Sequence, residues 1–235
     1  MFKAAADGAT KHPSPSYINF LRFHFVDNGI DDMPTVTLDP TQAGAVITRD
    51  NYFWAAELGQ QVTITFGFRS TAPSYFPSFS RSTPVQIDSL IKVLGLWSDA
   101  ANIKFQQVNA GGFTDQATML FANAFEPQGA WMAQGGMPSS KNLSSSSGEG
   151  DVWLNLGFHG NDALGSTQFS INALGGLDFQ TLIHEVGHAI GLNHPGNYNG
   201  GTVTYATSAN YVEDTWQYTV MSYFSAAETG ANHIY

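Results

Sequence analysis

The chain has 235 residues, 43% of them hydrophobic, which is enough for one large domain or two small ones with a sizeable core. Its 9 basic residues against 19 acidic ones give a net charge of −10, which argues against nucleic acid and against an anionic membrane surface as partners. No apolar run approaches the roughly 18 to 20 residues that a membrane span requires, and a chain without cysteine has no disulfides to stabilise it.

The N-terminal segment, residues 1–16, is small and polar and contains two prolines, Pro13 and Pro15. Such a segment offers little apolar surface to bury, so we interpret it as a mobile leader or processing segment. Residues 17–235 are expected to form one domain with two lobes.

The first half of this domain alternates between helix and strand patterns, which favours an α+β fold with helices against a mixed sheet. Residues 40–49 follow Asp39, a good N-cap, and begin with proline, which favours a short helix. Residues 61–68 alternate polar and apolar side chains, which indicates a strand with one buried face. Residues 84–100 carry apolar side chains at helical spacing and are long enough to be the helix that backs the domain. Further strands are predicted at residues 103–108 and 118–121.

Another helix is predicted to begin near Leu177, with Asp178 as its N-cap after a pair of glycines. Two histidines of this helix, His184 and His188, are expected to face a cleft. Its apolar side chains recur at the helical period and form a stripe toward the core, at Leu182, Ile183, Val186, Ala189 and Ile190.

Eleven residues from His184 to His194, with the sequence HEVGHAIGLNH, have the spacing of a zinc site. Histidines four apart lie on one face of an α-helix, so the imidazoles of His184 and His188 can converge on one ion. Glu185 follows the first of them, which places its carboxylate beside the metal in the position of a general base. Gly191 can adopt the left-handed backbone that ends a helix, so that the chain turns and returns His194 to the ion.

Three protein ligands leave a fourth coordination position open, which is typical of a catalytic zinc site. Structural sites are usually closed by four protein ligands, commonly with thiolates, and this chain has no cysteine. We therefore expect one catalytic Zn²⁺. Three other interpretations remain open: an amphipathic helix whose histidines are polar surface or satisfied core residues, a zinc site without catalytic activity, and a zinc ion that only staples the fold.

The motif and the Pro195-Gly196 pair after it resemble the extended zinc signature of the metzincin metalloproteases, in the form found in the serralysin branch, the bacterial alkaline proteases. Downstream, Tyr211–Thr215 and Thr219–Tyr223 resemble the serralysin segment that leads into its Met-turn. Upstream, residues 47–54 and 118–122 are similar more loosely. The likeness covers most of the chain, and it is sharp only around the motif and the Met-turn.

This resemblance implies a zincin-like catalytic domain over residues 17–235, a twisted mixed β-sheet backed by helices with the zinc helix at the cleft between two lobes. Met221 would be the methionine that packs beneath the zinc. Tyr223 would be the tyrosine that can ligate zinc, swing away when substrate arrives and hydrogen-bond the tetrahedral oxyanion. The alternative for Tyr223 is a core tyrosine near the site.

In the family the cleft is bordered by an edge strand that runs antiparallel to the bound peptide, and the resemblance assigns this strand to residues 130–134. Pairing of a peptide with a strand edge uses main-chain hydrogen bonds and tolerates many sequences. The alternative for the tryptophan in this segment is an ordinary core or rim aromatic. The candidate substrate-binding residues are Ala130, Trp131, Met132 and Ala133.

Two positions depart from the family pattern: Asn197 stands where an aspartate is expected, and Phe224 stands where a tryptophan commonly follows the tyrosine. Neither is a ligand position. A serralysin-like domain is also expected to continue past Tyr235 into a helix and then into glycine-rich repeats, so calcium is expected only in that C-terminal part. The Gly-Gly-x-x-Asp stretch of this chain, residues 111–115, is not repeated.

The predicted function is a secreted, extracellular zinc endopeptidase that hydrolyses peptide bonds with Glu185 as general base. The expected partners are protein or peptide substrates and a proteinaceous protease inhibitor, with neither nucleic acid nor membrane among them. The alternative is a fragment that contains zinc, lacks activity and only docks peptides or an inhibitor along the edge strand.

Overall fold

The computed structural model describes five stretches of the chain, residues 36–76, 78–126, 132–138, 148–157 and 176–231. All of them lie within one compact unit, Asp32–Tyr235. The leader predicted over residues 1–16 lies outside the described residues. Among the helices of the described stretches, none is long and apolar enough to cross a membrane.

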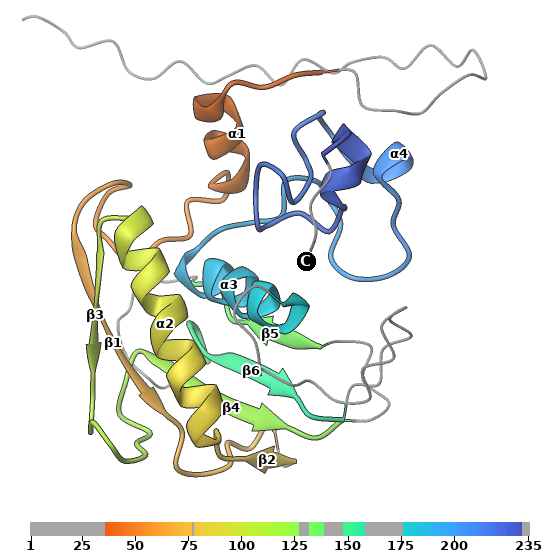
Figure 1. The fold of residues 1–235 in the computed structure, drawn as a ribbon. Helices are drawn as coiled ribbons and strands as arrows, with labels where there is room; N and C mark the ends of the chain where they lie inside the picture. The colour runs from red at the N-terminus through yellow and green to blue at the C-terminus, as the bar shows by residue number, and fades with distance from the viewer. Residues whose placement is uncertain (1–35, 77, 127–131, 139–147, 158–175, 232–235) are drawn as a thin grey trace, which may run out of the picture. The chain divides into compact units, whose positions relative to one another are not determined.

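A mixed β-sheet is the main layer of this unit (Figure 1). Its strands are β1 (Val62–Phe68), β2 (Phe79–Ser80), β3 (Ile103–Gln107), β4 (Met119–Ala124), β5 (Ala133–Gly135) and β6 (Val152–Asn155). The order across the sheet is β3-β1-β4-β6-β5, and β2 pairs with the C-terminal end of β4. Strands β1, β3, β4 and β6 run parallel, whereas β5 is antiparallel to β6. β5 is therefore the last strand of the order, with one edge directed away from β6.

The helical segments of the described residues are α1 (Pro40–Ile47), α2 (Pro84–Ala100), α3 (Leu177–Ile190), the single-turn α4 (Tyr205–Ser208) and the 3-10 helix η1 (Ala226–Thr229). The first two begin in the same way. Asp39 and Thr83 accept hydrogen bonds from backbone N–H groups three residues on, and the side chains of Gln42 and Gln86 accept one from the cap backbone in return. These capping boxes, each followed by proline, explain why both helices begin where the sequence predicts them.

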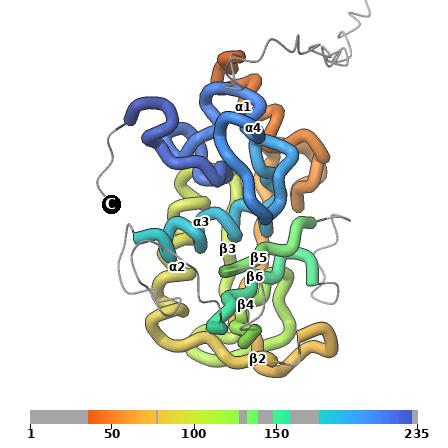
Figure 2. The backbone as a smooth tube through the Cα atoms, turned by 90° about the vertical axis from the view of Figure 1, so that its right-hand side faces the viewer, coloured from red at the N-terminus to blue at the C-terminus, as the bar shows by residue number. Residues whose placement is uncertain are grey.

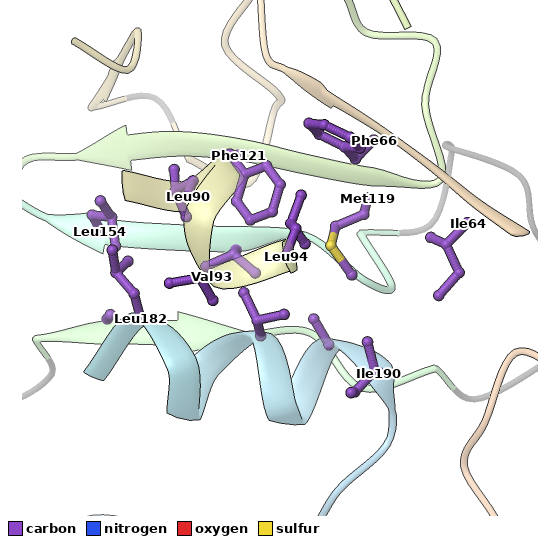
Figure 3. Packing of buried hydrophobic residues seen from close by; sticks show 14 of the residues in the cluster. Ile64, Phe66, Leu90, Val93, Leu94, Met119, Phe121, Leu154, Leu182 and Ile190 are labelled. Carbon is purple, nitrogen blue, oxygen red and sulfur yellow. The ribbon is translucent and has the colours of Figure 1, made fainter. Parts of the chain in front are cut away.

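The main hydrophobic core lies between one face of the sheet and the helices α2 and α3 (Figure 3). Side chains alternate between the two faces of a strand, so every second residue of β1, β4 and β6 points toward the helices. The fully buried side chains of this layer include Ile64, Phe68, Leu90, Val93, Met119, Phe121, Val152, Leu154, Leu182 and Val186. Their close packing fixes α3 against the sheet and makes it a rigid support for any ligand that it carries.

The opposite face of the sheet carries a smaller cluster around Trp153. Trp153 pairs with Ala122 of β4 on one side and with Gln134 of β5 on the other. Phe76 and Phe79, from the segment that follows β1, pack against it. The loop between β1 and β2 therefore covers part of the face that α2 and α3 leave open.

The helix α3 ends at a turn that leads the chain away from the sheet. Gly191, its C-cap, has a left-handed backbone with φ of 113°, and the N–H groups of Gly191 and Leu192 bond back to His188 and Gly187 of the last turn. The chain that follows, residues 192–231, lies on the side of α3 away from the sheet in both views (Figures 1 and 2). The helix thus lies between the sheet and a C-terminal segment with little regular structure.

The predicted α+β architecture is confirmed, with differences at the element ends. The N-cap of α3 is Gly176, so the prediction of Asp178 as cap is wrong, and Asp178 lies in the first turn instead. A carboxylate in the first turn also interacts favourably with the helix dipole, which is why the two positions are hard to separate in a sequence. The first helix ends at Ile47, and β4 continues to Ala124, beyond the predicted strand.

Candidate metal centre

Three histidines from two neighbouring segments meet beside the C-terminal half of α3. His184 and His188 belong to α3, and His194 belongs to the segment that follows the turn at Gly191. The Nε2 atom of His194 lies 3.0 Å from that of His184 and 2.9 Å from that of His188. The structure therefore brings together the three side chains that the sequence predicts as ligands.

The second ring nitrogen of each histidine lies against a backbone carbonyl. For His184, His188 and His194 the Nδ1 partners are the carbonyl oxygens of Val220 at 2.7 Å, Leu192 at 2.6 Å and Tyr198 at 2.7 Å. Because a carbonyl oxygen only accepts hydrogen bonds, each Nδ1 carries the proton. Each neutral ring then keeps its lone pair on Nε2, and the backbone fixes the plane of the ring.

This donor set fits a divalent metal ion. Three Nε2 lone pairs that face one another repel unless a cation lies between them, and in a tetrahedral site with Zn–N bonds of about 2.0 to 2.1 Å the nitrogens would be about 3.3 Å apart. Burial lowers the pKa of His184 to about 3 and that of His194 to about 4. Both rings therefore stay neutral, the form that binds metal, well below neutral pH.

Glu185, directly after the first histidine, is buried against the edge strand β5. Gly135 of β5 approaches so closely that a Cβ atom there would lie 2.0 Å from the carbonyl oxygen of Glu185 and 3.1 Å from Cβ of His188. Burial raises the pKa of the Glu185 carboxyl to about 7, and a backbone hydrogen bond from Gly135 opposes this shift. A carboxyl group that titrates near neutrality can both accept and release a proton.

Met221 is buried against the middle of α3. A Cβ atom at Gly187 would lie 2.5 Å from the Met221 sulfur, so the glycine between the two helical histidines makes room for the thioether. The residue before Met221 supplies the Val220 carbonyl that holds His184. The turn around Met221 therefore supports His184 both by packing and by a hydrogen bond.

Tyr223 lies beside two of the histidines. Its ring centroid is 4.5 Å from that of His194 and 5.7 Å from that of His184. Burial raises the pKa of its phenol, and a backbone hydrogen bond with Gly200 opposes the shift. The hydroxyl is therefore protonated, and able to donate a hydrogen bond, at neutral pH.

A second tyrosine, Tyr198, supports His194. The two rings are stacked, with centroids 5.2 Å apart and an interplanar angle of 22°, and the Tyr198 carbonyl holds Nδ1 of the histidine. The Tyr198 hydroxyl donates a hydrogen bond of 2.7 Å to the carboxylate of Asp214, which is fully buried. Asp214 thus fixes Tyr198, and Tyr198 fixes the third histidine. Neither residue carries a functional signal in the sequence beyond the place of Asp214 in the segment that resembles serralysins.

The Tyr198→Phe variant is expected to bind metal about tenfold more weakly. It removes the hydrogen bond to Asp214 that fixes Tyr198, and Tyr198 in turn holds His194. Competition with a chelator measures the dissociation constant. The matched control is Tyr205→Phe, since Tyr205 is a buried tyrosine of the same cluster whose hydroxyl bonds to the carbonyl of Val212. Equal losses of metal affinity in the two variants would show that the cluster acts only through general stability.

The segment of looser resemblance upstream also contacts the end of α3. The Arg49 guanidinium donates a hydrogen bond of 2.6 Å to the carbonyl of His194, and the Trp54 indole donates one of 2.8 Å to the carbonyl of Ala189. The carbonyl of Tyr52 lies at the position that a Cβ atom on Gly191 would occupy. The turn between the second and third histidine is therefore held from outside as well as by its own backbone.

The strand predicted at residues 130–134 lies partly outside the described residues, since Ala130 and Trp131 are not among them. The structure has a strand, β5, over Ala133–Gly135, shifted toward the C-terminus, and it is antiparallel to β6 at the end of the sheet order. Met132, just before it, bonds through its carbonyl to the N–H of Asn155. A strand edge therefore does lie beside Glu185; the strand begins three residues later and ends one residue later than predicted.

A match to a known family decides the class of the protein. A sequence model of the family described as Metallo-peptidase family M12B Reprolysin-like matches residues 45–233, which include all three histidines and Glu185. The chain belongs to this reprolysin-like metallopeptidase family. It is similar to "Serralysin" of Proteus mirabilis, with 34% identity over 214 residues, and to "Metalloprotease AprA" of Pseudomonas entomophila (strain L48), with 33% identity over 235 residues. The predicted serralysin-like metzincin domain is thereby confirmed.

The reprolysin-like chain spans less than half the length of the curated relatives that it matches. The alignment with the Proteus mirabilis serralysin covers 83% of this chain and 41% of the relative, and that with "Serralysin C" of Dickeya chrysanthemi, 32% identical, covers 94% and 46%. Membership of a metallopeptidase family, together with the group of three histidines, implies a metal ion.

Neither of the two residues that depart from the serralysin pattern, Asn197 and Phe224, is a ligand of the candidate metal centre. Asn197 is exposed, so its side chain contributes nothing to the buried support of the histidines. Phe224 is buried and packs against the rings of Tyr198 and Tyr205, with centroids 5.1 and 5.7 Å apart. An aromatic core residue is retained there, which is all that this position supplies.

Proposed function

We propose that this chain is a zinc-dependent endopeptidase that hydrolyses peptide bonds in protein substrates. The observation that carries the proposal is the convergence of three neutral imidazoles, with Nε2 of His194 2.9 to 3.0 Å from those of the other two, beside a buried carboxyl group with a pKa of about 7. Membership of a metallopeptidase family and similarity to proteins named serralysin support it.

His184, His188 and His194 would hold the metal through their Nε2 atoms. When bound, zinc lowers the pKa of a coordinated water and polarises the scissile carbonyl group. Among the described residues, no carboxylate or fourth histidine joins the three at ligand distance, so the group leaves room for water and substrate. The carbonyl oxygens behind each ring keep the three donors in place when substrate enters.

Glu185 is the proposed general base. Its carboxylate accepts a proton from the attacking water and delivers that proton to the leaving amine nitrogen, so the reaction needs no covalent bond between enzyme and substrate. The hydrogen bond from Gly135 holds the carboxylate toward the edge of β5, along which the substrate would lie.

Tyr223 is proposed to hydrogen-bond the carbonyl oxygen of the scissile bond as negative charge develops on it. A phenol donor close to that oxygen stabilises the transition state more than the ground state, because the charge is greatest there. The raised pKa of Tyr223 keeps this donor protonated around neutral pH, where Glu185 ionises.

The edge of β5 that pairs with no strand of the described residues is the proposed substrate track. In an antiparallel ladder only alternate residues bond to the neighbouring strand. Met132 and Gly136 bond toward β6, so the intervening Ala133 and Gly135 direct their backbone groups to the other edge. The Gly135 N–H bonds to Glu185 there, and the remaining backbone groups can pair with a peptide that adds as a further strand. The residues proposed to contact substrate remain Ala130, Trp131, Met132 and Ala133.

Metal analysis paired with a protease assay tests this function. We expect about one zinc per chain and hydrolysis of a quenched fluorescent peptide that a chelator abolishes and added zinc restores. If the protein binds zinc but cleaves no peptide, it is an inactive binding domain and the proposed function is wrong. Hydrolysis that continues unchanged in excess chelator would rule out zinc chemistry.

Activity is expected to fall as the pH is lowered through neutrality. The carboxyl of Glu185 has a pKa of about 7 without metal, and a nearby cation would lower it, so the acid limb of kcat/KM should lie at or below that pH. Below it the protonated carboxyl cannot accept a proton from water. The profile is measured from about pH 4 to about pH 9 with zinc content followed in parallel, because protonation of the imidazoles releases the metal. A rate independent of pH across this range would argue against Glu185 as the base.

The site of action and two further partners are proposed on the resemblance to serralysins alone. We propose that the protein is secreted and works outside the cell, that a proteinaceous inhibitor can occupy its substrate track, and that calcium binds only in a C-terminal repeat region. Detection of the protein in the medium of cells that produce it with its natural flanking sequence tests the first of these.

A further inference from the structure

A cavity of about 310 Å³ lies on the face of the sheet opposite to α3. Three aromatic rings line it. Phe76 packs on Trp153 with centroids 4.4 Å apart at 37°, and Tyr75 meets the same indole edge-to-face with centroids 6.2 Å apart at 76°. Tyr75 is 51% exposed although its hydroxyl is hydrogen-bonded, so one wall of the cavity is an accessible aromatic side chain.

The cavity adjoins the strand edge that is proposed to bind substrate. Gln134, Gly135 and Gly136 of the β5 region line it, and Gln134 is the register partner of Trp153. Successive side chains of a strand point to opposite faces, so a peptide added to β5 directs every second side chain to the face of Trp153. Side chains on that face of the added peptide lie beside Gln134, which lines the cavity together with Trp153, so one of them can enter the cavity.

The floor of the cavity is polar, and the one ionisable carboxylate among its described lining residues is paired. Asp151 lines it, and this carboxylate is paired with the Arg69 guanidinium. The same carboxylate accepts hydrogen bonds from the Tyr75 hydroxyl at 3.0 Å and from the N–H of Leu120 at 3.3 Å. Both of its oxygens therefore already accept hydrogen bonds and its charge is paired, so a cationic side chain would have to compete with Arg69 and an anionic one would meet Asp151. A neutral planar ring suits such a floor best.

The size and shape of the cavity also favour a ring. Its volume is at the lower limit of ligand pockets, which fits one large side chain rather than an extended ligand. Glycines make part of the wall, since a Cβ atom on Gly136 would lie 2.4 Å from the carbonyl oxygen of Gly148. A flat ring can pack on bare peptide groups on one side and on aromatic edges on the other.

We propose that this cavity, between Tyr75, Phe76 and Trp153, is a specificity pocket that binds an aromatic side chain of the substrate, one that projects from the peptide strand paired with β5. The inference rests on the proposed function and adds the class of side chain that the enzyme selects. It also separates selection from chemistry, because the cavity and the three histidines lie on opposite faces of the sheet.

The experiment uses quenched peptides that share one scissile bond and carry Phe, Ala or Lys at each position in turn. We expect one position at which Phe raises kcat/KM about tenfold over Ala and over Lys. In Tyr75→Ala that ratio is expected to fall to about twofold or less, whereas Tyr75→Phe, which keeps the ring, retains it. The matched control is Phe125→Ala, which removes a ring of similar exposure, 55%, that does not line the cavity.

The proposal is overturned if no position prefers an aromatic residue, or if the preference survives unchanged in Tyr75→Ala. Binding of the same peptides to Glu185→Gln protein, followed by fluorescence anisotropy, gives a second readout that does not need turnover. A Phe preference in binding that Tyr75→Ala removes supports the pocket even if the wild-type protein cleaves nothing, in which case only the proposed function fails.

Discussion

Glu185→Gln is expected to keep its zinc and to lose about three orders of magnitude in the rate of peptide hydrolysis. The amide has the shape of the carboxyl group, and its oxygen can still accept the hydrogen bond from Gly135, but an amide cannot take a proton from water. Burial raises the pKa of Glu185 to about 7, which means that the folded state disfavours the charged form. The free energy of unfolding of the variant is therefore expected to be unchanged or higher at and above neutral pH, where wild type must ionise this group.

The control for this variant is Asp178→Asn. Asp178 lies in the first turn of the same helix, away from the three histidines, so the same change from carboxylate to amide occurs on the same element. Its rate is expected to stay within about twofold of wild type, with at most a small loss of helix stability. Zinc content is measured for both proteins. If Glu185→Gln cleaves at the rate of wild type, the assignment of the base is wrong.

The part of the site that lies within one helix and one turn could be predicted from the sequence. The spacing of His184, Glu185 and His188 has one geometric outcome once the segment is helical, because the helical period sets which side chains share a face. The turn that returns His194 depends on Gly191, whose left-handed conformation is available to glycine and costly for other residues. Local rules were sufficient there.

The order of the strands could not be predicted in this way, because it depends on pairing between distant segments. The strand β6 is buried at all four positions, so it lacks the alternation that marks a strand with one solvent face. The strand β5 has three residues, and its register is set by β6 and by the approach of Gly135 to α3. The resemblance to serralysins therefore placed a strand at residues 130–134, but its start lies three residues later and its end one residue later in the structure.

The residues that hold the metal-site side chains in place could not be predicted from the sequence either. Tyr198 and Asp214 are joined by a hydrogen bond across a segment with little regular structure, and no periodicity connects them. Gly135 and Glu185 meet because a strand edge packs on a helix. In each case one partner is a common residue type whose role appears only when the other is placed beside it.

Gly191→Ala is expected to lower the free energy of unfolding by about 3 kcal/mol or more and to weaken zinc binding. The residue has φ of 113°, a conformation that strains any side chain with a Cβ atom. That atom would also lie 1.5 Å from the carbonyl oxygen of Tyr52, which is backbone and can move only if the chain moves. Since His194 follows three residues later, the shift would carry the third ligand away from the other two. Denaturant unfolding and chelator competition measure the two effects.

The control variant Gly59→Ala separates the effect of backbone strain from the effect of a displaced His194. Gly59 has a similar conformation, with φ of 83°, but a Cβ atom there meets nothing within 4 Å, so only the backbone strain of about 1 kcal/mol is expected. A metal that binds only the folded state stabilises it by an amount that rises with the logarithm of its affinity, so the gain in unfolding free energy on adding zinc reports the geometry of the three histidines. If the turn at Gly191 places His194, that gain shrinks in Gly191→Ala and is unchanged in Gly59→Ala. If both variants keep the full gain, the turn contributes stability alone and the third histidine is placed by Arg49 and Tyr198 instead.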